Sequence, residues 1–188
     1  MGPTVAAFVL LFLLTGLVEV VNRTSGARRP GTTVDDRKSS MVLGFTHTAV
    51  LISAIVFPVL GVGRLAVGSA FAWTAVAVMV LAFAGQVWAM RTLGEHFKFV
   101  LATDDGQPLV ERGPYRKLRH PGYLAQIVFF LAFGAAMQNA WTLAVVTVAV
   151  AIGYAYRIRT EERMLARAFG ERWAQYASER ARLVPGVY

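Results

Sequence analysis

Five apolar stretches limit what this chain can fold into. They cover residues 5–21, 41–60, 65–90, 122–137 and 140–156. A helix needs about 20 apolar residues to cross the hydrocarbon core of a bilayer. The second and third stretches reach that length, and the first comes close to it. The sequence therefore predicts an all-α integral membrane protein with about five transmembrane helices.

The last two stretches are shorter, with 16 and 17 residues, and only Gln138 and Asn139 separate them. As a helix, each would be about 25 Å long, which is less than the thickness of the hydrocarbon core. We expect a tight helical hairpin that barely crosses the membrane or stops short of its far side. No Lys or Arg precedes the first stretch, so we interpret it as a retained helix and not as a signal peptide.

The composition supports a membrane protein and excludes several functions. Hydrophobic residues make up 56% of the chain and charged residues 16%, whereas a soluble domain carries about 25% charged residues. The sequence has no cysteine, which excludes disulfides, thiolate metal sites and cysteine nucleophiles. Its three histidines are too scattered for a zinc cluster, so no metal site is expected.

The distribution of basic residues predicts the orientation in the membrane. Eighteen of the 19 Lys and Arg residues lie in residues 22–40, 91–121 and 157–188, and the other is Arg64. Five crossings would place these three regions on one side and Arg64 on the other. Positive loops face the cytoplasm, so we expect the N-terminus outside. The net charge of +8 then reflects topology, and no nucleic-acid partner is expected.

Most of the polar residues lie in the loop 91–121 and the tail 157–188, both on the predicted cytoplasmic face. The short turn between the last two helices makes this loop and the start of this tail neighbours in space. Pro121 is suited to the first turn of a helix, which places His120 at the mouth of the fourth helix. Free N–H groups at such a helix start favour an anionic ligand group. His120 is thus either part of a binding site or a simple helix cap.

The tail has two features of its own. Arg157 and Glu161 are four residues apart, so they share a helix face where the fifth helix leaves the membrane, as a functional pair or a surface ion pair. Four apolar or aromatic residues then recur at helical spacing: Leu165, Phe169, Trp173 and Tyr176. They predict a C-terminal amphipathic helix, which would serve as a membrane anchor or as a lid over the loop.

Two ionisable residues lie within predicted membrane helices. Glu19 is near the inner end of the first helix, and His47 is one to two turns inside the second. Residues of this kind are often functional in membranes, although both are close enough to an interface to extend toward water. The sequence does not assign either of them a role.

Several short motifs, in order, resemble the C-terminal half of isoprenylcysteine carboxyl methyltransferase. The resemblance covers about residues 91–185, whereas the first three helices match only as generic apolar spans. The motifs are Leu109-Val110, Gly113-Pro114-Tyr115, Arg119-His120-Pro121-x-Tyr123, Arg157-x-x-x-Glu161-Glu162, Phe169-Gly170 and Trp173-x-x-Tyr176. The length of the chain suits a single membrane domain over residues 1–188, with three N-terminal membrane helices in 1–90. The resemblance implies that residues 91–188 are a methyltransferase-like catalytic half.

The resemblance also implies a cofactor and residues that hold it. The methyl donor would be S-adenosylmethionine, with S-adenosylhomocysteine as product, and the loop before the Arg-His-Pro motif would wrap around it. The implied cofactor-binding residues are Gln107, Leu109, Val110, Tyr115, His120, Pro121, Tyr123 and Glu161. Arg157 would be the catalytic residue on the acceptor side. The sequence lacks the longer Glu run and the extra N-terminal helices of eukaryotic relatives, so a prenyl-cysteine acceptor is not implied.

The leading hypothesis is therefore methyl transfer to a lipophilic or small acceptor at the cytoplasmic face of a bacterial or archaeal inner membrane. The acceptor atom could be a carboxylate oxygen, a thiol sulfur or an amine nitrogen. One alternative is a relative of sterol-type NADPH reductases, which carry a partly similar C-terminal half. Another is a non-catalytic membrane binding protein on the same scaffold. Under the leading hypothesis, the expected partners of the protein are the lipid bilayer and the methyl acceptor.

Overall fold

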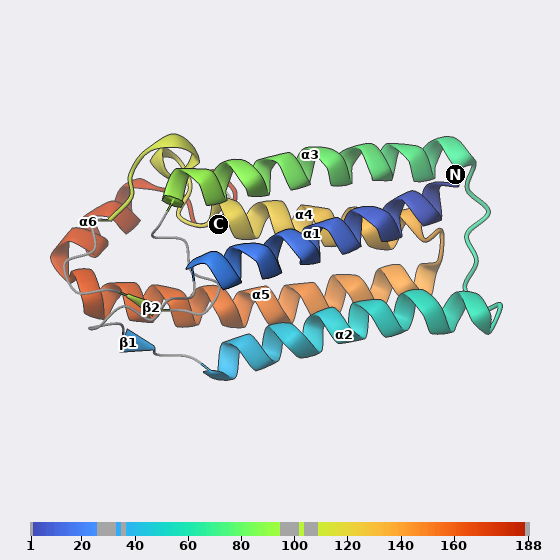
Figure 1. Ribbon diagram of the computed structural model, residues 1–188, viewed down its shortest axis with the longest axis horizontal. Coiled ribbons are helices and arrows are strands. Elements are labelled where there is room, and N and C mark those ends of the chain that lie inside the picture. The colour runs from blue at the N-terminus through green and yellow to red at the C-terminus, as the bar shows by residue number, and fades with distance from the viewer. Residues whose placement is uncertain (1, 26–32, 35–36, 95–101, 104–108, 187–188) are drawn as a thin grey trace.

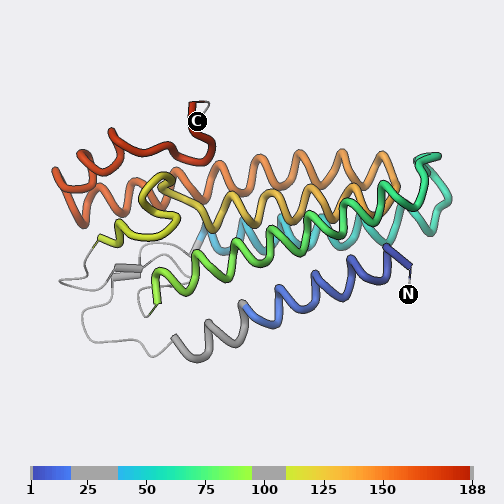
Figure 2. The backbone as a smooth tube through the Cα atoms, turned by 90° about the horizontal axis from the view of Figure 1, so that it is seen from above, coloured from blue at the N-terminus to red at the C-terminus, as the bar shows by residue number. Residues whose placement is uncertain are grey.

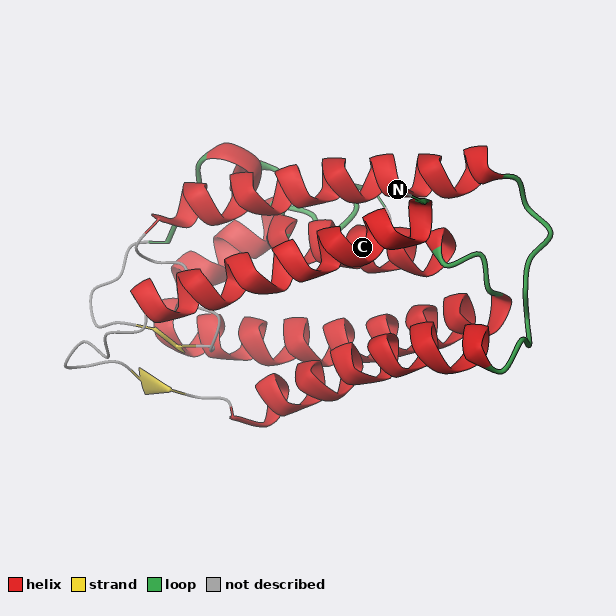
Figure 3. Cartoon of the chain, turned by 45° about the vertical axis from the view of Figure 1, so that its right-hand side comes forward, coloured by secondary structure: helices red, strands yellow, loops and turns green. Residues whose placement is uncertain are grey.

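The computed structural model describes residues 2–25, 33–34, 37–94, 102–103 and 109–186 (Figure 1). In this part of the chain, long helices run side by side along one axis. They are α1 (Pro3–Ser25), α2 (Arg37–Val59), α3 (Ser69–Leu93), α4 (Pro121–Ala136) and α5 (Ala140–Phe169). The smaller elements are the 3-10 helix η2 (Gly113–Arg116), helix α6 (Glu171–Glu179) and two-residue strands β1 (Thr33–Val34) and β2 (Ala102–Thr103). Figure 3 shows how far helix dominates the chain.

The membrane character predicted from the sequence is confirmed. Within the described residues, three helices are long and apolar enough to cross a bilayer: Lys38–Val59 of α2, all of α3 and all of α5. Two shorter apolar helices accompany them, Pro3–Leu17 within α1 and Pro121–Ala136, which is α4. Large apolar side chains such as Phe12, Phe45 and Leu81 are exposed on the outside of the bundle, as expected of surfaces that face lipid. The chain is an integral membrane protein.

The turn between α4 and α5 is as short as expected. Gln138 adopts a positive φ of 50°, and the Asn139 side chain caps α5 by accepting a hydrogen bond from the Thr142 N–H at 3.0 Å. The Asn139 amide also donates to the carbonyl of Val62 at 2.7 Å. These bonds fix the turn against the loop that joins α2 and α3.

The expected length of the fifth helix was wrong. The apolar stretch 140–156 predicted a helix of about 25 Å, whereas α5 continues past Glu161 through the polar residues that follow and spans 30 residues, or about 45 Å. The amphipathic set is also not on one helix. Leu165 and Phe169 belong to the end of α5, whereas Trp173 and Tyr176 are buried on α6. Gly170, at φ 54°, breaks the helix between them, because most other residues avoid that conformation.

Small residues let the helices approach each other closely. Helix α3 packs on α4, α2 packs on α5, and α4 also contacts α5, while α1 contacts α3 and α4. A Cβ on Gly153 of α5 would overlap the hydroxyl of Thr46 on α2, and a Cβ on Gly85 of α3 would lie 3.7 Å from Ala125 on α4. Close backbone approach of this kind drives helix packing in membranes, where lipid is as apolar as the core.

The two ends of the bundle differ in character. One end holds the loop that joins α2 and α3, with Arg64 bridged to Asn139, and the N-terminus lies there too (Figure 1). The other end gathers the start of α2, the end of α3, the start of α4, the second half of α5, and α6. Figure 2 shows α1 along one side of the bundle and the C-terminal segment along the opposite side. The polar loop and tail therefore meet at one end, as the hairpin predicted.

We expect Gly153→Leu to destabilise the bundle, because its side chain would collide with Thr46 and force α2 away from α5. Overpacking a close contact costs about 1–3 kcal/mol. The measurement is the melting temperature in detergent, which should fall. Gly44→Leu on α2 is the matched control, since a Cβ there would have no atom of another described element within 4 Å. Equal melting temperatures for the two variants would contradict the close α2–α5 packing.

Candidate functional site

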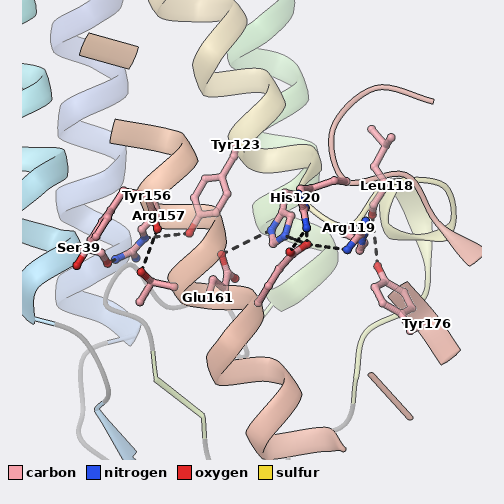
Figure 4. A network of polar contacts seen from close by, with 12 residues as sticks. Ser39, Leu118, Arg119, His120, Tyr123, Tyr156, Arg157, Glu161 and Tyr176 are labelled. Carbon is pink, nitrogen blue, oxygen red and sulfur yellow. Dashed lines mark hydrogen bonds and ion pairs between the residues drawn. The ribbon is translucent and has the colours of Figure 1, made fainter. Parts of the chain in front are cut away.

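A group of buried and partly buried polar residues lies where the start of α4 meets the second half of α5. Figure 4 shows His120, Tyr123, Arg157 and Glu161 side by side at this place, with Ser39 at one edge and Tyr176 at the other. His120 and Tyr123 come from the beginning of α4, and Arg157 and Glu161 from α5. The α4–α5 hairpin brings the two pairs together, although more than 30 residues separate them.

His120 lies between two carboxylates. It directly precedes α4, where Pro121 takes the first helical position, and its side chain is only 3% exposed. Its Nδ1 atom is 3.6 Å from Oε2 of Glu161, and its Nε2 atom is 3.2 Å from Oε1 of Glu162. The ring also stacks on Tyr123, with centroids 5.6 Å apart. Because each edge of the imidazole faces an acidic side chain, its orientation is closely controlled.

The two glutamates next to each other on α5 have different surroundings. Glu162 accepts hydrogen bonds from Arg119 Nη1 at 2.8 Å and Arg182 Nε at 3.0 Å, and its second oxygen pairs with Arg182 Nη2 at 2.7 Å. Oε2 of Glu161 is buried and has no hydrogen-bond partner among the residues that the structure describes, since His120 Nδ1, at 3.6 Å, lies just outside hydrogen-bonding range. A buried carboxylate oxygen without a donor is costly, so this atom is suited to a cation or an N–H group from a ligand.

Arg157 is almost completely buried, with 2% of its surface exposed. Its Nε donates to the hydroxyl of Tyr123 at 3.0 Å, and its Nη1 donates to Ser39 at 2.6 Å and Ser40 at 3.4 Å. These contacts join α2, α4 and α5 at the level of the site. The guanidinium is therefore a fixed positive group just inside the helical bundle.

Polar contacts continue deeper between the helices. The hydroxyl of Tyr154 donates to the side-chain oxygen of Gln126 at 2.8 Å, one turn beyond Tyr123. His47 stacks on Phe130 with centroids 4.8 Å apart, and no described residue forms a hydrogen bond with its buried Nε2. The side chain of Glu19 lies outside the described residues.

The loop before His120 lies against the site. Burial raises the pKa of Tyr115 well above its usual value, and the negative charge of Glu161 raises it further. The Tyr176 hydroxyl on α6 donates to the carbonyls of Tyr115 at 2.9 Å and Leu118 at 3.3 Å. Burial raises the pKa of Tyr176 to about 12, so this donor keeps its proton at neutral and moderately alkaline pH.

The C-terminal segment fastens the same loop through its backbone. Residues 180–182 run alongside residues 117–120, with Leu118 and Ala181 as bridge partners. The N–H of Arg119 donates to the Ala181 carbonyl at 2.9 Å, and the N–H of His120 donates to the Arg182 carbonyl at 3.2 Å. The Arg119 side chain also donates from Nε to the Arg180 carbonyl at 3.1 Å. The tail therefore determines where His120 enters α4.

The structure brings together most of the residues predicted for the site. His120, Pro121, Tyr123, Arg157 and Glu161 converge at the α4–α5 junction. Tyr115 lies on the loop beside them, with the partly buried Leu109 and Val110 preceding it, whereas Gln107 lies outside the described residues. Their roles in cofactor and acceptor binding stay predictions.

The sequence interpretation gave no role to several residues of this network. Glu162 is the last residue of the Arg157-x-x-x-Glu161-Glu162 motif, and its place next to Glu161 is the only signal in the sequence that points to it. Ser39 comes from α2 and was missed, because nothing in the sequence pairs it with Arg157. Arg182 was missed for a different reason, since it follows α6 in an irregular segment.

Comparison with known proteins defines the class. The model of the isoprenylcysteine carboxyl methyltransferase (ICMT) family matches residues 75–167, which contain the second part of α3, the loop, α4 and nearly all of α5. The fold is similar to a solved structure of the eukaryotic intramembrane Ras methyltransferase ICMT, with a TM-score of 0.59 and 20% identity. That match covers 82% of this chain and 55% of the other. The chain belongs to the isoprenylcysteine carboxyl methyltransferase family.

Three curated bacterial proteins are also similar. Cobalt-zinc-cadmium resistance protein CzcN of Cupriavidus metallidurans is 44% identical over 69 residues, which are 37% of this chain and 32% of that protein. Uncharacterized protein YpbQ of Bacillus subtilis is 28% identical over 94 residues, 50% of this chain and 56% of YpbQ. Nickel-cobalt-cadmium resistance protein NccN of Alcaligenes xylosoxydans xylosoxydans is 29% identical over 100 residues, 53% of this chain and 46% of NccN. The chain thus spans about half of these relatives' length, or less.

We expect Tyr176→Phe to loosen the loop that carries His120, because the carbonyls of Tyr115 and Leu118 would lose their donor. A net loss of about 1 kcal/mol would raise local opening about fivefold. Hydrogen exchange of the amides in residues 113–120 measures this. Tyr156→Phe is the control, since Tyr156 is exposed on α5. Unchanged exchange in Tyr176→Phe would show that α6 does not hold the loop.

Proposed function

We propose that this protein transfers a methyl group from S-adenosylmethionine to a lipophilic or small acceptor at the cytoplasmic face of the membrane. One observation carries the proposal: a buried carboxylate oxygen of Glu161, to which no described residue donates a hydrogen bond, lies beside His120 at the mouth of α4. Membership of the family supports the same reading, because its matched segment contains both residues.

The residues at the site fit this cofactor. S-adenosylmethionine carries an amino group, a carboxylate and a sulfonium cation. Glu161 would accept the amino group at its unpartnered oxygen, and the positive end of α4, which begins at Pro121, would favour the carboxylate. Leu109, Val110 and Tyr115 would line the cofactor from the loop side, and Gln107 is assigned to the same role.

The chemistry needs alignment more than acid–base catalysis. When bound, S-adenosylmethionine would supply a methyl group on a sulfonium, with the sulfur as leaving group that keeps the electron pair of the broken carbon–sulfur bond; Glu161 and the loop residues would hold it, and Arg157 would hold the acceptor whose lone pair takes the methyl group. The protein's part is to hold both partners in line and to exclude water. A carboxylate, thiolate or neutral amine already has the lone pair required, so no strong base is needed.

Arg157 would orient the acceptor. It lies at the level of the site, where its contacts join α2, α4 and α5, and its planar group can hold a carboxylate or another polar head through two hydrogen bonds. A lipophilic acceptor would reach it from the membrane, and the water-soluble cofactor would enter from the cytoplasm. We keep oxygen, nitrogen and sulfur open as the methylated atom.

The same proposal includes a topology of five membrane segments, with the N-terminus outside and the site in the cytoplasm of a bacterial or archaeal cell. It rests on the position of Arg64 at the end of the bundle opposite the site. Reporter fusions at residue 64 and at the C-terminus should report opposite sides of the membrane. Fusions that report the same side would refute this topology.

Binding measurements test the proposed function. Purified protein in detergent should bind S-adenosylhomocysteine in isothermal titration and should not bind NADPH. Labelled S-adenosylmethionine should then transfer its methyl group into a lipid extract or a set of small thiols, amines and carboxylates. Binding of NADPH alone would favour a reductase, and binding of neither compound would favour a non-catalytic protein.

We expect His120→Ala and Glu161→Ala each to weaken S-adenosylhomocysteine binding at least tenfold. A hydrogen bond to a charged group contributes about 1.5–3 kcal/mol, and each 1.4 kcal/mol is tenfold in affinity. Isothermal titration measures the effect, with Glu171→Ala on the exposed start of α6 as control. Wild-type affinity in both folded variants would remove these residues from the cofactor site.

We expect Arg157→Lys to reduce methyl transfer at saturating cofactor while it leaves cofactor affinity within about threefold. Lysine keeps the charge but cannot form two parallel bonds to a polar head. Arg163→Lys is the control, because Arg163 is exposed six residues later on the same helix. Near-normal turnover of Arg157→Lys would mean that Arg157 only secures the helices.

A further inference from the structure

Glu162 is held from several directions at once. Its Oε1 accepts hydrogen bonds from Arg119, His120 and Arg182, and its Oε2 pairs with Arg182 at 2.7 Å. Arg182 thus binds the carboxylate through two nitrogens and both oxygens, the arrangement that gives arginine–carboxylate pairs their fixed geometry. With two arginines on it, Glu162 is an ionised acceptor whose direction is set by its partners.

Arg182 acts on His120 from two sides. Its guanidinium holds the carboxylate that contacts Nε2 of the imidazole, and its backbone carbonyl accepts the N–H of the same histidine at 3.2 Å. One residue of the C-terminal segment therefore controls both the backbone and the ring of His120.

This arrangement determines where the ring carries its proton. An ionised carboxylate can only accept hydrogen bonds, so Nε2 of His120, 3.2 Å from Glu162, must be the donor. Nδ1 lies 3.6 Å from Oε2 of Glu161, which is too long for a hydrogen bond, so among these two contacts only the one at Nε2 directs the proton, and Nδ1 lies on the proposed cofactor side. In metal sites, a hydrogen bond donated by one ring nitrogen leaves the other nitrogen without a proton, so that its lone pair can bind a ligand. The same rule applies to the two nitrogens of His120.

We propose that Arg182 is a positioning residue: through Glu162 it keeps the proton of His120 on Nε2 and turns Nδ1 toward Glu161 and the cofactor. This inference rests on the proposed function, because it assigns His120 to cofactor binding. It adds the C-terminal segment to the site through the contacts of Arg182 with Glu162 and with the N–H of His120.

A variant of the nearby Arg180 can distinguish two roles of the C-terminal segment: positioning the His120 ring and anchoring the segment itself. It fastens the same segment by pairing with Glu111 at 3.1 Å and by lying over the Tyr176 ring at 4.4 Å. Neither contact reaches Glu162 or His120. Arg180→Met therefore weakens the attachment of the tail and leaves the Glu162–His120 contact in place, which makes it the matched control for Arg182→Met.

A double-mutant cycle tests the inference with S-adenosylhomocysteine as ligand. We expect Arg182→Met to weaken binding about tenfold in the wild-type background and less than about twofold in a His120→Ala background, because it acts through the histidine. Arg180→Met should have the same effect in both backgrounds. Equal losses for Arg182→Met with and without His120 would overturn the inference.

The ring of His120 gives a readout that needs no ligand. In protein labelled with ¹⁵N-histidine, wild type and Arg180→Met should show the proton on Nε2, with the signal assigned by its absence from His120→Ala. In Arg182→Met the proton should distribute between both nitrogens. A ring spectrum unchanged by Arg182→Met would overturn the inference.

These measurements also separate this inference from the proposed function. If wild-type protein bound no S-adenosylhomocysteine, the proposed function would fail. The histidine spectrum would still test whether Arg182 keeps the proton of His120 on Nε2. If Arg182→Met did not fold, Arg182→Lys would replace it, since lysine keeps the charge without the two parallel bonds. Arg182→Lys with the wild-type spectrum would contradict positioning by the guanidinium.

Discussion

Burying charged side chains at one end of an apolar bundle requires that each be given partners, and the arrangement of that end follows from this need. An unpaired ion in a low-dielectric interior is costly, whereas a paired and hydrogen-bonded one is tolerated. Arg157 on α5 donates hydrogen bonds to the hydroxyls of Ser39 on α2 and Tyr123 on α4, and these bonds join three helices. Glu162 on α5 accepts hydrogen bonds from Arg119 and Arg182, and these bonds join α5 to the loop before α4 and to the C-terminal segment. The polar contacts thus add to the packing of the helices and tie the loop before α4 and the C-terminal segment to α5.

The adjacent glutamates show how one helix serves two purposes. Consecutive residues on an α-helix point about 100° apart, so Glu161 and Glu162 face different surroundings although they are neighbours in sequence. Glu162 faces the loop and tail and pairs with Arg119 and Arg182, whereas Glu161 keeps a buried oxygen that receives no hydrogen bond within the described part of the chain. His120 lies between them and contacts both. Structural support and proposed ligand binding are therefore divided between the two carboxylates, with the imidazole connecting them.

The sequence predicted much of this because its strongest signals are local. Apolar stretches located the helices, the two-residue turn located the hairpin, and the hairpin brought His120 to Glu161. The length of α5 was not predicted, because the prediction used hydropathy, which falls at Arg157. The helix continues because residues such as Glu162, Met164 and Ala166 have high intrinsic helix propensity. Partners that come from distant segments, such as Ser39 and Arg182, leave no periodic signal, and only tertiary packing reveals them.

The central claim is that the unpartnered oxygen of Glu161 receives the amino group of the cofactor. Isothermal titration of S-adenosylhomocysteine and of its analogue without that amino group, each into wild type and Glu161→Ala, tests it most directly. The claim predicts that removing the amino group weakens binding to wild type at least tenfold, about 1.4 kcal/mol or more, but weakens binding to Glu161→Ala less than about twofold. The same loss in both proteins would contradict it.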